Sequence, residues 1–179
     1  MKTVNICICV LICLLGFLSC KESGVSNRNN AFWIDEPGKQ DSVFQQLEAI
    51  TYGAVAGEKL RDSLAFLIVP IRESCPSCLD KTIDSILSYK DRLDERCIIV
   101  ISMAAGRKTV NSYFRERKGE LPIIPGQLIL DSINLAAKFN LFEANPAIYY
   151  TFEGKAYKRV NAYPRTVKQD LHNFFNKHL

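Results

Sequence analysis

Residues 64–89, LAFLIVPIRESCPSCLDKTIDSILSY, hold the clearest structural pattern in this 179-residue chain. Residues 64–71 are an almost unbroken apolar run, which is typical of a strand buried on both faces of a sheet. Over residues 78–89 the apolar side chains instead recur every three or four positions, which indicates a helix with one buried face. Cys75 and Cys78 therefore fall at a junction between a buried strand and an amphipathic helix.

The rest of the chain alternates between predicted strands and predicted helices. The expected elements, in order, are a helix within residues 43–60, the strand and helix just described, a strand at 97–103, a helix at 109–118, a strand at 128–130, a short helix at 133–139, a hairpin of 147–152 and 156–160 around Glu153-Gly154, and a helix from Val167 onward. Strands that alternate with helices give a largely parallel sheet covered on both faces, and the closing hairpin adds antiparallel strands. The predicted fold class is therefore α/β, with a central mixed β-sheet and flanking helices.

The start of the chain carries the pattern of an export signal. Lys2 gives a short positive end, and the apolar run over residues 4–18 is too short for a comfortable membrane span and is followed by a polar stretch. The run ends in Phe17-Leu18-Ser19-Cys20, which resembles the lipobox of bacterial lipoproteins, with Phe17 where Leu is usual. In that motif the chain is cut before the cysteine and its sulfur is acylated. An ordinary signal peptide and an uncleaved anchor are the alternatives.

The composition and net charge of the chain bear on whether its partner is a nucleic acid. Hydrophobic residues make up 47% of the chain and charged residues 23%, which is an ordinary globular balance. The formal net charge is +4, and the basic residues are dispersed along the chain. A weak, dispersed charge argues against nucleic acid as a partner.

The seven cysteines divide between the predicted signal and the predicted domain. If the signal is removed and Cys20 is acylated, the folded part retains Cys75, Cys78 and Cys97. An export signal implies an oxidising or redox-managed compartment, in which three thiols indicate one pair and one spare. Cys97 lies in an apolar strand, so we expect it to be a small buried core residue.

The positions of the paired cysteines suit thiol chemistry. Cys75 would lie at the helix N-terminus, where unpaired N–H groups and the helix dipole stabilise a thiolate and lower the thiol pKa. Pro76 fits the first helical position because its missing N–H costs nothing there. Cys78 would lie inside the first turn, close enough to form a disulfide with Cys75. An exposed nucleophile beside a shielded partner is the arrangement that thiol–disulfide exchange requires.

Two other interpretations of the pair stay open at this point. A C-x-x-C pair can supply half of a zinc site, but four ligands are needed, and the other candidates are Cys97, His172 and His178. We expect both histidines to lie on the solvated surface of the last helix, and we predict no metal site. The pair could also be an inert structural disulfide.

Residues 60–179 resemble the thioredoxin-like family, especially its exported, membrane-tethered TlpA-type members. The resemblance rests on the strand followed by CPSC at residues 75–78, on the order of elements, and on NPAIYY at residues 145–150 before the hairpin turn. It implies a thioredoxin-like fold and a redox-active Cys75–Cys78 disulfide, with Cys75 as nucleophile and Cys78 as resolving thiol.

The family also places a cis proline opposite the cysteine pair, and here Pro146 is the matching residue. The backbone of Asn145 would then offer strand-like hydrogen bonds to a bound peptide. The chain departs from the family pattern at three positions. Ser74 replaces the usual aromatic residue before the first cysteine, Asn145 replaces the frequent Thr or Val, and Val69 stands where thioredoxin keeps a buried acid. Glu73 is close by and is expected to be exposed.

We therefore predict a lipoprotein signal peptide at residues 1–19, a lipidated Cys20 with a flexible tether over 20–42, and a thioredoxin-like domain over 43–179. The predicted function is extracytoplasmic thiol–disulfide exchange without a cofactor. The alternative is a non-catalytic thioredoxin-fold module, binding or structural, in a cell-envelope assembly. Expected partners are protein thiols or disulfides, a membrane redox partner, and the membrane itself through lipid on Cys20. The expected location is the cell envelope, on its periplasmic face or outer surface.

Overall fold

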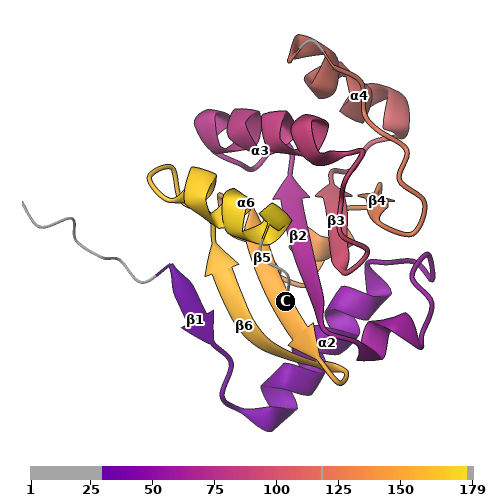
Figure 1. The fold of residues 1–179 in the computed structure, drawn as a ribbon, viewed down its shortest axis with the longest axis vertical. Helices are drawn as coiled ribbons and strands as arrows, with labels where there is room; N and C mark the ends of the chain where they lie inside the picture. The colour runs from indigo at the N-terminus through magenta and orange to yellow at the C-terminus, as the bar shows by residue number, and fades with distance from the viewer. Residues whose placement is uncertain (1–29, 118, 177–179) are drawn as a thin grey trace, which may run out of the picture.

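A single mixed β-sheet organises the described part of the chain. The computed structural model describes residues 30–117 and 119–176. Its six strands follow the order β1-β6-β5-β2-β3-β4 across the sheet (Figure 1). In chain order they are β1 (Ala31–Trp33), β2 (Leu64–Pro70), β3 (Cys97–Ser102), β4 (Leu128–Asp131), β5 (Ala147–Phe152) and β6 (Lys155–Asn161). The strands β2, β3 and β4 are parallel, whereas β5, β6 and β1 pair antiparallel.

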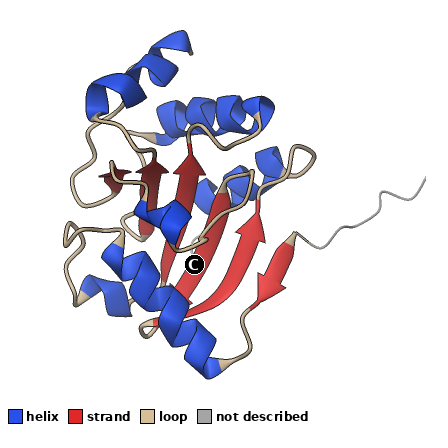
Figure 2. Ribbon diagram, turned by 180° about the vertical axis from the view of Figure 1, so that it is seen from behind, coloured by secondary structure: helices blue, strands red, loops and turns tan. Residues whose placement is uncertain are grey.

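Helices cover both faces of this sheet. They are α2 (Pro37–Ala49), α3 (Pro76–Tyr89), α4 (Arg107–Glu116), α5 (Leu135–Lys138), α6 (Val167–Asn176) and the short 3-10 helix η1 (Lys59–Arg61). Helices α3 and α6 lie on one face, and α2 and α5 lie on the other, as the front and back views show (Figures 1 and 2). The predicted α/β class, with a mixed central sheet and flanking helices, is confirmed.

The strand β2 lies at the centre of the hydrophobic core. All seven of its residues are buried. Ala65, Leu67 and Val69 pack in the cluster that includes α3 and α6, whereas Phe66 and Ile68 pack in the cluster on the α2 face. Successive side chains of a strand point to opposite faces, so a strand covered on both faces must be apolar throughout. This explains the unbroken apolar run.

The hairpin turn between β5 and β6 has the conformation that its sequence predicts. Glu153 and Gly154 both have positive φ, at 49° and 74°. Two positive φ angles in a two-residue turn match the right-handed twist of antiparallel strands. The hairpin places the start of β5 and the end of β6 at the same end of the sheet.

The structure corrects the predicted start of the domain. The strand β1 pairs with β6, and α2 begins at Pro37 rather than at residue 43, so residues 31–42 belong to the fold and not to a tether. The prediction failed because β1 has three residues, too few to show a period. The first turns of α2, residues 37–42, have the sequence PGKQDS, which contains no apolar spacing that would indicate a buried helix face. The predicted signal peptide and Cys20 lie outside the described residues.

Candidate redox site

The cysteine pair occupies the turn that follows the central strand. Beyond Pro70 the chain turns through residues 71–74 and enters α3, whose N-cap residue is Cys75. The backbone N–H of Cys78 donates to Cys75 Sγ at 3.1 Å, and the N–H of Leu79 donates to the Cys75 carbonyl at 3.0 Å. The sulfur of Cys75 thus takes the place that a Ser or Asp oxygen takes at most helix starts. The Cys78 N–H and the positive end of the α3 dipole stabilise negative charge on that sulfur.

Cys75 and Cys78 form a disulfide, with their Cα atoms 5.3 Å apart. The two sulfurs differ in access, because Cys75 is partly exposed whereas Cys78 is fully buried at 0% exposure. Pro76 and Ser77, between them, are exposed. An attacking thiolate therefore reaches the pair at Cys75, and Cys78 is shielded by the protein.

The loop before β5 lies against this pair. The N–H of Cys75 donates to the Ala144 carbonyl at 3.0 Å, and Asn145 Oδ1 lies 3.4 Å from Cys78 Sγ. The Pro146 carbonyl accepts from the Ala162 N–H at 2.8 Å, which ties the loop to the end of β6. The structure thus brings together the cysteine pair and the Asn145-Pro146 segment, although they are far apart in sequence.

The predicted cis bond at Pro146 is wrong. None of the peptide bonds among residues 30–117 and 119–176 is cis, so the Asn145–Pro146 bond is trans. An X–Pro bond favours trans by about 0.5–1 kcal/mol unless its surroundings impose cis. Here the trans form already directs the Pro146 carbonyl to Ala162. Asn145 reaches the pair through its side-chain carboxamide, and the neighbouring Ala144 carbonyl already accepts a hydrogen bond from Cys75.

The structure also shows the surroundings of Val69 and Ser74, two positions at which the chain departs from the family pattern, and of the nearby Glu73. Val69 has 0% exposure within β2, so an apolar side chain fills the place of the family's buried acid. The Oγ of Ser74 is buried and has no hydrogen-bond partner among the described residues. Glu73 is exposed, and its Oε1 accepts from Asn134 Nδ2 at 3.0 Å. Asn134, in the connection between β4 and α5, therefore holds the Glu73 carboxylate beside the turn.

A buried carboxylate, Asp131, supports the same end of the sheet, and the sequence reasoning missed it. It has 0% exposure and accepts hydrogen bonds from Tyr52 Oη at 2.5 Å and from Ser102 Oγ at 2.7 Å. The N–H groups of Leu135 and Ala136 donate to it at 2.8 Å each. Burial would raise the pKa of Asp131, but these hydrogen bonds outweigh burial and lower that pKa below its ordinary value. An acidic residue shortly before a helix was the available signal.

Asp131 connects to the cysteine turn through Asn134. The Asn134 N–H donates to the Asp131 carbonyl at 3.2 Å, and Asn134 Nδ2 donates to Glu73, two residues before Cys75. The ends of β2, β3 and β4 are therefore joined by one hydrogen-bonded set. Its effect is to fix the backbone on which the cysteine pair sits.

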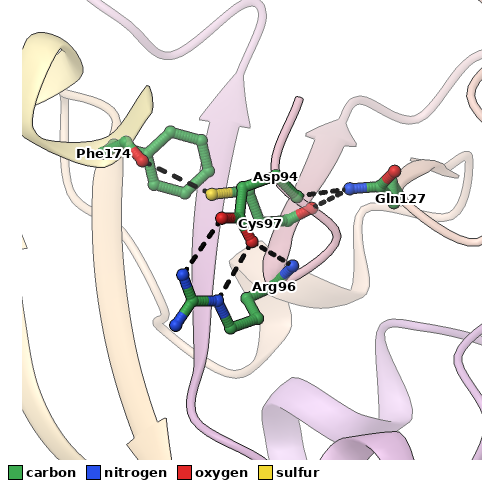
Figure 3. Close-up of polar contacts among 5 residues, drawn as sticks. All are labelled: Asp94, Arg96, Cys97, Gln127 and Phe174. Carbon is green, nitrogen blue, oxygen red and sulfur yellow. Dashed lines mark hydrogen bonds and ion pairs between the residues drawn. The ribbon is translucent and has the colours of Figure 1, made fainter. Parts of the chain in front are cut away.

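Cys97 takes no part in this site. It pairs with Ala65 at the start of β2, whereas the disulfide follows the end of β2, so the two lie at opposite ends of the sheet. Its thiol has 3% exposure and donates to the Phe174 carbonyl at 3.4 Å, and Gln127 donates to the Cys97 carbonyl at 3.0 Å (Figure 3). Burial raises the pKa of the Cys97 thiol to about 12, so it stays protonated. The expectation of a buried core cysteine is confirmed.

The remaining candidate ligands do not gather around the pair. His172 is exposed on α6, as predicted, and His178 lies outside the described residues. Within residues 30–117 and 119–176, no three His, Cys, Asp or Glu side chains are grouped so as to hold a metal ion. In the same part of the chain, no helix has the length and apolar character needed to cross a bilayer.

Comparison with protein-family models finds no match for this chain, and comparison with curated proteins finds none either.

Proposed function

We propose that the chain is an exported thiol–disulfide oxidoreductase with a thioredoxin-like fold. One observation carries the proposal, namely a disulfide whose first sulfur, on Cys75, is accessible at a helix N-terminus, while its second, on Cys78, is buried. A purely structural disulfide needs neither an exposed sulfur nor an N–H donor that stabilises that sulfur as a thiolate.

The arrangement of elements supports the thioredoxin-like part of the proposal. The pair follows the central strand β2 and begins α3, and the antiparallel hairpin of β5 and β6 is followed by α6 on the same face as α3. The segment 144–146 faces the pair, as it does in the family that residues 60–179 resemble. The trans bond at Pro146 is a departure from that family, so the proposal rests on the pair and the element order rather than on the proline.

The chemistry needs only the two sulfurs and a substrate. In the reducing direction, the Cys75 thiolate attacks one sulfur of a substrate disulfide, and the other substrate sulfur leaves as a thiolate and takes up a proton. Cys78, after losing its proton, attacks Cys75 Sγ in the mixed disulfide. The Cys75–substrate bond breaks, and the first substrate sulfur leaves as a thiol. Two electrons and two protons pass to the substrate, and oxidation of a substrate dithiol follows the same steps in reverse.

The proposed setting is the cell envelope. We propose that residues 1–19 are a lipoprotein signal, that lipid on Cys20 anchors the domain, and that a membrane redox partner exchanges electrons with the pair. The hydrophobic run and Phe17-Leu18-Ser19-Cys20 support this placement. Protein thiols or disulfides on the periplasmic face or outer surface are the proposed substrates.

A non-catalytic envelope module is the second candidate. It is favoured by the apolar Val69 at the position of the family's buried acid and by Ser74 in place of the aromatic residue. Without an acid near the buried thiol, deprotonation of Cys78 during resolution has less assistance. The module would bind or stabilise a partner with its disulfide permanently closed.

The redox couple of the pair separates the two candidates. The full-length chain is equilibrated in buffers of stepped dithiothreitol ratio, and free thiols are counted by alkylation and mass spectrometry. We expect the pair to exchange under native conditions, and we expect Cys75→Ser but not Cys97→Ala to abolish reduction of insulin disulfides. A pair that stays closed until the chain unfolds would instead establish the structural module.

A further inference from the structure

A cavity on the α2 face of the sheet lies outside the redox site. It has a volume of about 460 Å³ and is lined by Phe32, Val43, Phe139, Glu143, Tyr149 and Arg159, among others. This volume lies within the range of about 300–1,000 Å³ that is typical of small-molecule sites. Figure 2 shows this face, with α2 and α5 in front of the sheet.

A cross-strand row of side chains forms the floor of the cavity. Phe32 on β1 is opposite Arg159 on β6, and Arg159 is opposite Tyr149 on β5. Tyr149 is buried at 2% exposure, whereas Phe32 is 46% exposed. The row therefore combines an aromatic floor with an exposed aromatic side chain on an edge strand, and a cation lies between them.

The Arg159 guanidinium is fixed but incompletely paired. It lies over the Tyr149 ring, 5.8 Å from the ring centroid, and its Nε donates to Asn161 Oδ1 at 2.8 Å. Its Nη2 lies 3.4 Å from Glu143 Oε1, and no described side chain accepts from Nη1. A planar guanidinium held at its Nε presents the remaining N–H groups as a fork that suits a carboxylate.

The contact with Glu143 is the kind that a ligand can replace. The Arg159 side chain is only 20% exposed, whereas that of Glu143 is 66% exposed. A solvated carboxylate at a single long contact gains little from the ion pair. Lys39 also lines the cavity, so its lining has two basic side chains, Arg159 and Lys39, and one acidic side chain, Glu143.

We propose that this cavity binds a small amphipathic carboxylate. The carboxylate occupies the Arg159 fork in place of Glu143, and the apolar body packs on Phe32, Val43 and Phe139. Charge complementarity selects the anionic group, and the aromatic lining selects an aromatic or aliphatic body. This site is separate from the cysteine pair, and the proposal does not depend on the proposed redox function.

Isothermal titration calorimetry on the full-length protein measures binding. The sole tryptophan, Trp33, is not used as a reporter, because its ring stacks on Tyr157 and contacts Lys158, away from the cross-strand row that forms the cavity floor. Phenylacetate is the probe, and phenylacetamide is its neutral counterpart of nearly the same shape. We expect saturable binding of phenylacetate and about tenfold weaker binding of phenylacetamide, because a charge-assisted hydrogen bond is lost.

Three variants then assign the site. Arg159→Gln should weaken phenylacetate binding about tenfold, whereas Lys155→Gln, an exposed cation of the same strand outside the cavity, should leave it unchanged. Glu143→Gln should strengthen binding about two- to fivefold, because it removes the competing carboxylate. Equal binding of the two probes, or unchanged binding in Glu143→Gln, overturns the proposal. Because Glu143 is exposed, that variant decides the case even if Arg159→Gln does not fold.

Discussion

Asn145 Oδ1 lies 3.4 Å from Cys78 Sγ, at a sulfur with 0% exposure. In the disulfide this oxygen has no proton to accept. When the pair is reduced, the same oxygen can accept the S–H of a buried thiol. Asn145 therefore favours the reduced form of the pair over the oxidised form.

The Asn145→Leu variant tests this relationship. Loss of a hydrogen bond to a buried thiol costs about 0.5–1.5 kcal/mol in the reduced state only. For a two-electron couple, this cost lowers the reduction potential by about 10–30 mV. The potential is measured by equilibration in dithiothreitol buffers. Gln45→Leu, the same kind of change at an exposed position of α2, should leave the potential unchanged. A shift to a less negative potential would contradict the prediction.

The three thiols of the reduced domain should differ in reactivity. Cys75 is partly exposed at a helix N-terminus, which lowers a thiol pKa below about 8.5. The pKa of Cys97 is raised to about 12 by burial, so almost none of it is thiolate at neutral pH. A short pulse of iodoacetamide, read by peptide mass spectrometry, should label Cys75 first. Equal labelling of Cys75 and Cys78 would reject Cys75 as the nucleophile.

Asp131 should stabilise the fold in a pH-dependent way. Its folded pKa is lowered, so its contribution is complete above the unfolded pKa of about 3.9 and is lost as the pH falls through the folded pKa. Asp131→Asn should lower the free energy of unfolding by about 1–3 kcal/mol at pH 7, because buried N–H and O–H donors lose an acceptor. Urea unfolding should show a smaller difference from the wild type below pH 3.

Asp62→Asn is the matched control, because Asp62 is exposed after η1 and outside the Asp131 hydrogen bonds. That variant should leave the free energy of unfolding unchanged at both pH values. A difference between Asp131→Asn and the wild type that grows as the pH falls would show that the sign of the argument is wrong.

The targeting proposal predicts a change in partitioning. Cys20→Ala removes the sulfur that would carry lipid, so the processed variant should appear in the soluble fraction after export. Fractionation and intact-mass analysis of the mature N-terminus measure the effect, with Cys97→Ala as a control that leaves Cys20 in place. A native protein that starts at a residue other than Cys20, or that carries no lipid, would exclude the lipoprotein assignment.

Features set by long periodic segments could be predicted from the sequence. The strand β2, buried on both faces, required an apolar run, and α3 required a spacing of three and four over 14 residues. The turn at Glu153-Gly154 could be predicted because positive φ angles in a two-residue hairpin turn favour glycine. In each case the pattern follows from local backbone geometry.

Features set by distant contacts could not be predicted in this way. The strand β1 has three residues and exists only because β6 pairs with it. The partners of Asp131 come from Tyr52, Ser102 and the start of α5, which the fold alone brings together. At Pro146 the sequence permits either isomer, and the resemblance favoured the wrong one.

If the proposed lipid anchor is present, the way in which β1 joins the sheet limits the distance between the membrane and the redox site. The Asn30 carbonyl accepts from Asn161 N–H, and the next residue, Ala162, binds Pro146 beside the cysteine pair, so the chain enters the fold at its redox end. If Cys20 carries lipid, as we propose, nine residues lie between it and Asn30, and the ten steps from Cys20 to Asn30 can span at most about 36 Å. Under the proposed lipid anchoring, the sulfurs would reach only a shallow layer next to their own membrane. Substrates in that layer would meet the pair at a high local concentration, and proteins beyond it would be out of reach.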